Sequence, residues 1–267
     1  MPSAHPFGTG DVKLRVESLE FRVRMKRISL EETVSTNKYA RELPEDESLE
    51  LTLVTAEFQT AGRGAGTNKW ESERGQNLLF SIIAYPHQLP ANQVFAFSEI
   101  TALAICDILN SYTKGFHIKW PNDIYFGNKK AVGMLIENDL QGKNVRKSVI
   151  GVGVNINQTL FRSDAPNPVS LAQILGHEEN CEQVLKNIME RFICYYGMME
   201  GEHYGELHQL YMQHLYRKDA LHSYADDGGI FQARIRDVEP TGHLILEDGN
   251  GKLRRYDFKE VRFISEE

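Results

Sequence analysis

A loop that combines three glycines with one arginine is the segment best suited to chemistry. Gly62, Gly64 and Gly66 fall within five residues, Arg63 lies between the first two, and apolar runs predicted as strands flank the loop. Glycines at this density let backbone N–H groups approach a small anion, because no Cβ intervenes. A guanidinium on such a loop suits a carboxylate or a phosphate. The spacing fits neither a P-loop nor a G-x-G-x-x-G motif, and a tight connection between strands explains the loop equally well.

A second candidate is the segment KWPNDIY, which begins at Lys119. Pro121 follows a predicted strand end and fixes the backbone there, so Asn122 and Asp123 are expected to project from a rigid position. Pro-Asn-Asp is also an ordinary turn sequence. The lysine and tryptophan that precede it make the segment more specific.

Two further segments place glycines inside predicted strands. In KKAVGMLIE, Lys130 opens the strand and Gly133 leaves a gap where a flat ligand could lie against the backbone. In GVGVNIN, two glycines and Asn155 again indicate close approach of a ligand. The alternatives are a solvated lysine pair and a β-bulge, and each signal is weak in isolation.

Composition limits the classes of function. The chain has 267 residues and a net charge of −7, which allows one catalytic domain with a small module and argues against general nucleic-acid binding. Cys106, Cys181 and Cys194 form neither a metal-binding spacing nor a disulfide framework, so we expect buried, reduced thiols. We find no apolar run near about 18 residues and no signal peptide, which predicts a cytoplasmic protein without a membrane partner.

The surrounding pattern predicts an α+β fold in which a mixed β-sheet is flanked by helices. Residues 27–42 are predicted as a strand followed by a helix, whose start is marked by Ser35, Thr36 and Asn37. The other predicted elements are strands at 49–57 and 77–85, a buried helix over 91–112, hairpins over 115–157 and amphipathic helices over 181–214.

After residue 214 the pattern changes to short alternating strands separated by turn sequences, which predicts a small all-β barrel. We therefore expect three regions: a weakly structured lead-in at 1–24, a catalytic domain at 25–214 and a β-barrel at 215–267.

In order and spacing, these segments resemble the catalytic domain of the biotin protein ligases, the biotin–[acetyl-CoA-carboxylase] ligases. The matching segments are ETVSTN (32–37), QTAGRG (59–64), KW (69–70), KWPNDIY (119–125), K-x-x-G-x-L-x-E (130–137) and GVGVN (151–155). The resemblance implies a catalytic domain similar to class II synthetases, followed by the family's SH3-like barrel. It also implies the monofunctional type, since too few residues precede residue 25 for a helix-turn-helix DNA-binding domain.

The resemblance implies a two-step reaction. Biotin and ATP, with Mg²⁺, would form biotinyl-5′-adenylate, and biotin would then pass to one lysine of the carrier domain of a biotin-dependent carboxylase. Such a site must hold the neutral ureido end of biotin, bring two anions together and keep the adenylate from water.

The resemblance also assigns residues to these tasks. Those expected to bind biotin are Ser35, Thr36, Gln59, Gly62, Arg63, Gly133, Leu135 and Gly151. Those expected to bind ATP or the adenylate are Arg63, Gly64, Ala65, Trp70, Asn122, Lys130 and Asn155. The catalytic set is Lys130, Arg63 and Asp123, and the Mg²⁺ side is assigned to Asp123 and Glu137.

Three of these roles have a physical basis. Lys130 would offset repulsion between the biotin carboxylate and the α-phosphate, Trp70 would stack on adenine, and Asp123 would accept or orient the proton of the attacking amine. A plain helix N-cap is the alternative for Ser35 and Thr36.

The glycine loop departs from the family at one position. The family sequence is usually GRGRxG, whereas this chain has Ala65 in place of the second arginine. We expect weaker retention of the adenylate unless another cation, such as Lys69 or Arg74, compensates.

The competing hypotheses are a lipoate–protein ligase, a DNA-binding repressor and a pure binding module. The GRG loop, KWPND and the terminal β region favour biotin over lipoate, and the acidic charge argues against DNA. The sequence leaves open whether the chain forms a homodimer.

Overall fold

The structure is a computed structural model that describes residues 5–6, 10–16, 19–64, 66, 68–163 and 167–264, with side chains from Val23 onward.

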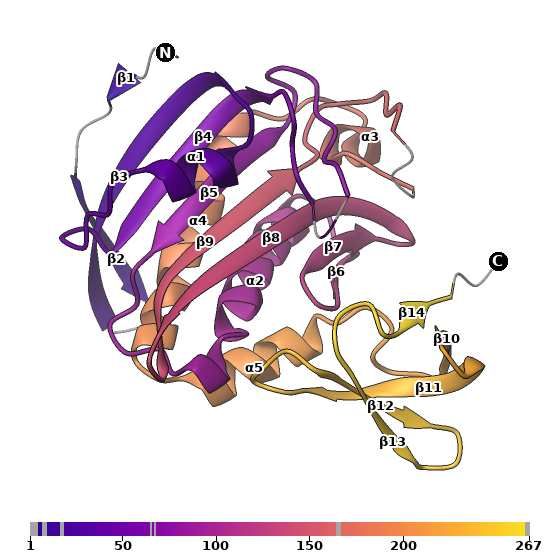
Figure 1. The fold of residues 1–267 in the computed structure, drawn as a ribbon. Helices are drawn as coiled ribbons and strands as arrows, with labels where there is room; N and C mark the ends of the chain where they lie inside the picture. The colour runs from indigo at the N-terminus through magenta and orange to yellow at the C-terminus, as the bar shows by residue number, and fades with distance from the viewer. Residues whose placement is uncertain are drawn as a thin grey trace.

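A nine-stranded mixed sheet forms the centre of the molecule (Figure 1). Its order is β1-β3-β4-β5-β9-β8-β7-β6, with β2 paired to β3, and only the β3–β4 pair is parallel. The strands are β1 (His5–Pro6), β2 (Gly10–Val16), β3 (Leu19–Thr33), β4 (Leu51–Gln59), β5 (Leu78–Ala84), β6 (Phe116–Lys119), β7 (Asp123–Phe126), β8 (Lys129–Gln141) and β9 (Asn144–Val154). The predicted mixed sheet is confirmed.

Helices cover both faces of this sheet, which explains the continuous apolar run of β5. Phe80 and Ile82 of β5 belong to the large core shared with the long helices, whereas Ile83 belongs to a smaller core that includes Ala40. Successive strand residues point to opposite faces, so a strand covered on both sides is apolar throughout. The helices are α1 (Thr36–Glu42), α2 (Ala96–Tyr112), α3 (Leu171–Leu175), α4 (Cys181–Glu200) and α5 (Tyr204–Gln213), with a 3₁₀ turn at Ala91–Gln93.

The stretch Ala91–Tyr112 is long and apolar enough to cross a membrane by length and composition. The expectation of no apolar run near this length is therefore wrong. Most of the stretch is buried inside the fold, where α2 packs in the large core together with α4. A helix that is mostly buried in this way is typical of the centre of a folded domain.

The amino-terminal region differs from the predicted lead-in. Strand β2 pairs with the first part of β3 in an antiparallel hairpin whose register runs from Gly10 opposite Met25 to Val16 opposite Leu19. The expectation of a weakly structured segment is wrong for these residues. The rest of the segment 1–24 lies outside the described residues, apart from β1.

The three cysteines are free, as predicted, but only Cys106 is buried; Cys181 and Cys194 are partly exposed. Burial raises the pKa of the Cys106 thiol to about 12.

The carboxyl-terminal residues form a second, five-stranded antiparallel sheet in the order β13-β12-β11-β10-β14. Its strands are β10 (His222–Asp226), β11 (Gly229–Val238), β12 (Leu244–Asp248), β13 (Leu253–Tyr256) and β14 (Arg262–Phe263). The predicted short strands are confirmed. Closure into a barrel stays a prediction, since no pairing joins the edge strands β13 and β14 within the described residues.

Candidate active site

One cleft gathers most of the predicted site residues, although they come from elements far apart in the sequence. It is bounded by the start of α1, the glycine loop after β4, the turn before β7, and strands β8 and β9. The predicted residues that line it are Ser35, Thr36, Gln59, Arg63, Gly64, Trp70, Asn122, Asp123, Lys130, Gly133, Leu135 and Gly151.

Four other predicted residues are not among those that line this cleft. Gly62 is buried in the base of the loop. Asn155 lines a smaller cavity whose wall shares Lys69, Trp70 and Lys130 with the main cleft. Glu137 is absent from the described lining of both cavities. Ala65 lies outside the described residues.

The glycine loop is a tight hairpin. The Trp70 N–H donates to the Gly62 carbonyl at 3.0 Å, and the Gly64 N–H donates to the Asn68 carbonyl at 2.8 Å. A Cβ on Gly62 would lie 2.7 Å from the Trp70 carbonyl oxygen, so the close approach of the two arms itself requires glycine there. The glycine loop is therefore both a tight connection between strands and a part of the cleft, because Arg63 and Gly64 line the cleft.

The Trp70 indole fills the gap that the sequence assigned to a flat ligand. A Cβ on Gly133 would lie 2.6 Å from Trp70 Cζ3, and a Cβ on Gly153 would overlap the ring. The two glycines face each other across β8 and β9, and together they form a recess for the indole. The reading of Gly133 as a ligand gap is therefore corrected. The role of Gly153 was missed, because it depends on a neighbouring strand.

A second glycine recess holds Asn37. A Cβ on Gly151 would overlap the Asn37 amide. The Asn37 Nδ2 donates to the Leu135 carbonyl at 3.0 Å and to Glu137 Oε2 at 3.1 Å. The Glu137 carboxylate is thus a partner of Asn37, and this contact gives Glu137 a function in positioning the start of α1.

Hydroxyl and amide groups make one end of the cleft neutral and polar. The Thr36 N–H and hydroxyl both donate to Gln59 Oε1, at 2.7 and 3.2 Å. The Ser81 hydroxyl lies 2.8 Å from Thr36 Oγ1 and 2.6 Å from Asn37 Oδ1. Ser81 was also missed, although a serine inside the apolar run of β5 is a visible signal.

Ser35 occupies the N-cap position of α1, but its side chain makes no capping hydrogen bond. The residue is 3% exposed and lines the cleft. Its hydroxyl is therefore not committed to the helix, which favours the ligand-binding reading over the plain N-cap.

A lysine and a carboxylate form the charged centre of the cleft. Lys130 Nζ lies 2.6 Å from Asp123 Oδ2, and each side chain is 27% exposed. β7 begins at Asp123, just after Pro121, and β8 carries Lys130, so the β7–β8 hairpin holds both groups. Partial burial strengthens their attraction compared with a surface pair.

Lys119 is a further cation close enough to interact electrostatically with this pair. Lys119 Nζ donates to the Tyr125 hydroxyl at 3.2 Å and lies 4.5 Å from the centre of that ring. Burial lowers the pKa of Lys119, and burial raises the pKa of Tyr125.

Two buried polar atoms near Lys130 have no hydrogen-bond partner within the described part of the chain: Trp70 Nε1, a donor, and Asn155 Oδ1, an acceptor. Both residues line the smaller cavity. An unsatisfied buried polar group costs about 1–3 kcal/mol, so this pair is suited to a polar ligand that supplies both an acceptor and a donor.

The residues do not form a metal site of their own. No group of three or more His, Cys, Asp or Glu side chains suited to a metal occurs in the described ranges. Asp123 is the one acidic residue in the described lining of the cleft, and it is paired with Lys130. The donor set therefore does not fit a protein-held Mg²⁺ shared by Asp123 and Glu137.

Comparison with known proteins gives consistent relatives. The bifunctional ligase/repressor BirA of Bacillus subtilis (strain 168) is 29% identical over 229 residues, which cover 83% of this chain and 69% of that protein. The biotin–[acetyl-CoA-carboxylase] ligase of Paracoccus denitrificans is 26% identical over 210 residues, which cover 74% and 85%. The solved structure of biotin protein ligase from Aquifex aeolicus in complex with biotin and ATP has a TM-score of 0.74 at 23% identity, and covers 89% of this chain and 99% of that chain.

The fold is that of the biotin protein ligases. The profile of the biotin/lipoate A/B protein ligase family matches residues 29–155, which include every predicted site residue. This match makes the chain similar to the biotin/lipoate A/B protein ligase family over just under half of its length.

Proposed function

We propose that the chain is an ATP-dependent biotin–protein ligase, which forms biotinyl-5′-adenylate and transfers biotin to a lysine of a carboxylase carrier domain. The observation that carries this proposal is a single cleft with a neutral polar end at Thr36 and Gln59 and a cationic end at Arg63 and Lys130. A ligand with a neutral polar head, an apolar body and a carboxylate tail fits this division. The names of the Bacillus and Paracoccus relatives support the same activity.

In the first half-reaction, a biotin carboxylate oxygen bonds to the α-phosphorus of ATP and the bond to the pyrophosphate leaving group breaks. Lys130 lies where one cation can contact both anions, which lowers their repulsion and stabilises the charge of the transition state. Arg63 on the adjacent hairpin contributes a second positive charge. Mg²⁺ would arrive with the phosphates of ATP, since a metal bound mainly by phosphate oxygens and water is usual for this ion.

In the second half-reaction, the acceptor lysine nitrogen bonds to the biotinyl carbonyl carbon and AMP leaves. The attacking amine must be neutral, so a carboxylate beside the reacting carbonyl should accept or orient its proton. Asp123 is suited to this role because its carboxylate lies against Lys130, at the expected junction of the two ligands.

We assign the smaller cavity to the nucleotide base. The amino group of adenine is a donor, which complements the unpartnered acceptor Asn155 Oδ1 in the wall of this cavity. Because the indole now lies in the glycine recess of β8 and β9, stacking of Trp70 on adenine would use the face of the ring that points away from the sheet.

The test is ATP- and Mg²⁺-dependent incorporation of labelled biotin into a purified carboxylase carrier domain, compared with labelled lipoate. We expect biotin incorporation that Lys130→Ala slows strongly and that Lys129→Ala, on the exposed neighbour, leaves intact. Preferential incorporation of lipoate would replace this function with the alternative in the same family.

Several finer expectations are part of the proposal. We propose that the five-stranded sheet is the expected SH3-like barrel, which its antiparallel order supports. The cytoplasmic location, the absence of nucleic-acid binding and the oligomeric state stay predictions; a gel-shift assay and sedimentation measurements test the last two.

A further inference from the structure

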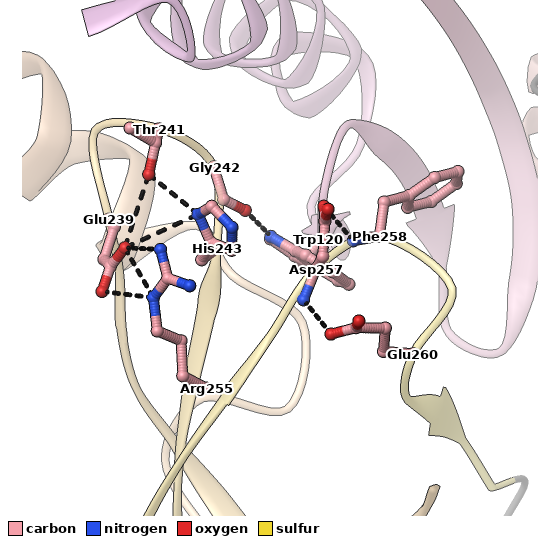
Figure 2. Close-up of polar contacts among 9 residues, drawn as sticks. All are labelled: Trp120, Glu239, Thr241, Gly242, His243, Arg255, Asp257, Phe258 and Glu260. Atoms are coloured by element: carbon pink, nitrogen blue, oxygen red, sulfur yellow. Dashed lines mark hydrogen bonds and ion pairs between the residues drawn. The ribbon is translucent and has the colours of Figure 1, made fainter. Parts of the chain in front are cut away.

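The loop between β13 and β14 brings the carboxyl-terminal sheet to the active site. Phe258, in this loop, lines the cleft although it is 45% exposed, and its ring centre lies 6.1 Å from that of Trp120. The Trp120 Nε1 donates to the Gly242 carbonyl at 2.9 Å, which fixes the sheet against the KWPND segment (Figure 2). The second sheet thus contributes a side chain to a site otherwise formed by the first.

The backbone of this loop is held by its own acidic side chains. The Asp257 N–H donates to Glu260 Oε2 at 2.7 Å, and the Phe258 N–H donates to Asp257 Oδ1 at 2.6 Å (Figure 2). Lys259, at the tip, has a φ of 75°. This left-handed conformation is unfavourable for a residue with a long side chain, so the loop holds Lys259 in a conformation that glycine or asparagine would adopt at lower cost.

With this backbone conformation at Lys259, its side-chain ammonium reaches the glycine hairpin. A Cβ on Gly66 would collide with Lys259 Nζ, so the ammonium lies directly against the backbone of the hairpin tip. Within the described residues, Lys259 has no acidic ion-pair partner. A cation placed beside an anion-binding loop is suited to a phosphate or carboxylate of the ligand.

The alternative cations for this task are less suitable. Arg74 forms an ion pair with Glu32, and its guanidinium lies 5.0 Å from the centre of the Phe58 ring. Lys69 lines the cleft, but it belongs to the same hairpin as Arg63, and the two residues are opposite each other in an antiparallel backbone β-bridge. Among these cations, Lys259 is the one that approaches the hairpin tip from the other sheet.

We propose that Phe258 and Lys259 close the adenylate end of the cleft, with Lys259 supplying the positive charge that the hairpin lacks at residue 65. This inference rests on the proposed function. It makes the carboxyl-terminal sheet a part of the active site, and Lys259 a residue that retains the bound adenylate. Its strained backbone is the local cost of bringing a cation from one sheet to a loop of the other.

The experiment measures release of biotinyl-adenylate without acceptor, after rapid removal of free ligand from the full-length protein. We expect Lys259→Gln to speed release about tenfold, as for the loss of a hydrogen bond to a charged group, and Lys259→Arg to restore retention. Lys252→Gln, on the exposed turn between β12 and β13 of the same sheet, is the matched control and should match the wild type.

A double variant separates the charge from a structural role. Arginine introduced at residue 65 in the Lys259→Gln background should return release to the wild-type rate, because the charge is supplied again. Equal release by Lys259→Gln and the wild type, or no rescue by the double variant, would overturn the inference. Formation of pyrophosphate by the wild type with biotin and ATP is scored separately: if it is absent, the proposed function fails, and if it is present, only the Lys259 assignment is under test.

Discussion

Trp70 and Gly153 are complementary: the indole of the glycine hairpin occupies the space that a Cβ on the β9 glycine would fill. This contact joins the hairpin to the sheet and sets the position of the ring beside Lys130. The glycine recess is therefore needed to hold the Trp70 indole in place. It affects ligand binding indirectly, because it sets the position of that ring.

We expect Gly153→Ala to displace the indole, because the added Cβ would overlap the ring. The cost should be about 1–3 kcal/mol of unfolding free energy, as for overpacking in a core, together with a raised KM for ATP. Urea unfolding and adenylate formation measure the two effects. Gly249→Ala is the control, since a Cβ there meets no atom within 4 Å; an equal effect of both changes would contradict the complementarity.

Ser35→Ala should raise the KM for biotin about three- to tenfold, the worth of a neutral hydrogen bond, and leave stability unchanged. The reason is that the Ser35 hydroxyl makes no capping bond. The matched control is Ser170→Ala, because the Ser170 hydroxyl accepts from the Gln173 N–H at 3.2 Å in a capping box. That change should cost about 1 kcal/mol of stability with the KM for biotin intact. A loss of stability in Ser35→Ala with unchanged KM would restore the plain N-cap reading.

Removal of the Lys130 charge should affect the first half-reaction most. We expect Lys130→Ala to slow adenylate formation by about 10²–10³-fold, as for loss of one group that stabilises the transition state. Pyrophosphate release in a single turnover measures this rate. A change confined to the KM for biotin would show instead that Lys130 only binds the ground state.

Asp123→Asn should impair transfer to the acceptor more than adenylate formation, because the amide cannot accept the proton of the attacking amine. Transfer is measured from preformed biotinyl-adenylate, and adenylate formation is measured without acceptor. Equal losses in the two half-reactions would mean that Asp123 acts only by positioning Lys130, which lies 2.6 Å away.

Contact between the helices α2 and α5 and the carboxyl-terminal sheet should weaken at alkaline pH. His208 of α5 bridges Glu99 of α2 at 2.9 Å and Asp237 of β11 at 2.8 Å. The hydrogen bond to Glu99 raises the pKa of His208 from 6.5 to about 8, although burial opposes the shift. Because the folded-state pKa is the higher one, the stabilisation is complete below pH 6.5 and is lost as the pH rises through 8.

We therefore expect the wild type to lose about 1–2 kcal/mol of unfolding free energy between pH 6 and pH 9 relative to His208→Gln. Urea unfolding at the two pH values measures the difference. His117→Gln, at an exposed histidine, is the control and should follow the wild type. Parallel curves for the wild type and His208→Gln would show that this bridge does not stabilise the fold.

Much of the site was predictable because its residues belong to contiguous segments. Lys130, Asp123 and Gln59 were assigned from local sequence and all line one cleft. Asn37 and Phe258 were not assigned to the site, because their roles depend on packing against β9 and on the approach of the second sheet. Such contacts leave no periodic pattern in the chain.

The fold shows the same division. The burial of β5 followed from its apolar run, and α2 followed from helical spacing. The β2–β3 hairpin was missed even though GDVKLRV and LEFRV alternate as strands do. The frequent charges in these segments obscured that signal, since strands exposed on one face carry polar residues at every second position.

The burial of α2 has a consequence for synthesis of the chain. The stretch that contains this helix is apolar enough to cross a membrane by length and composition alone, and α4, which packs with α2 in the large core, begins only at Cys181. All residues between Tyr112 and Cys181 must be translated before that cover exists, which takes several seconds at about 5–20 residues per second. During this interval the face of α2 that packs against α4 stays uncovered, so we expect the order of the helices along the chain to make nascent α2 a target for chaperones.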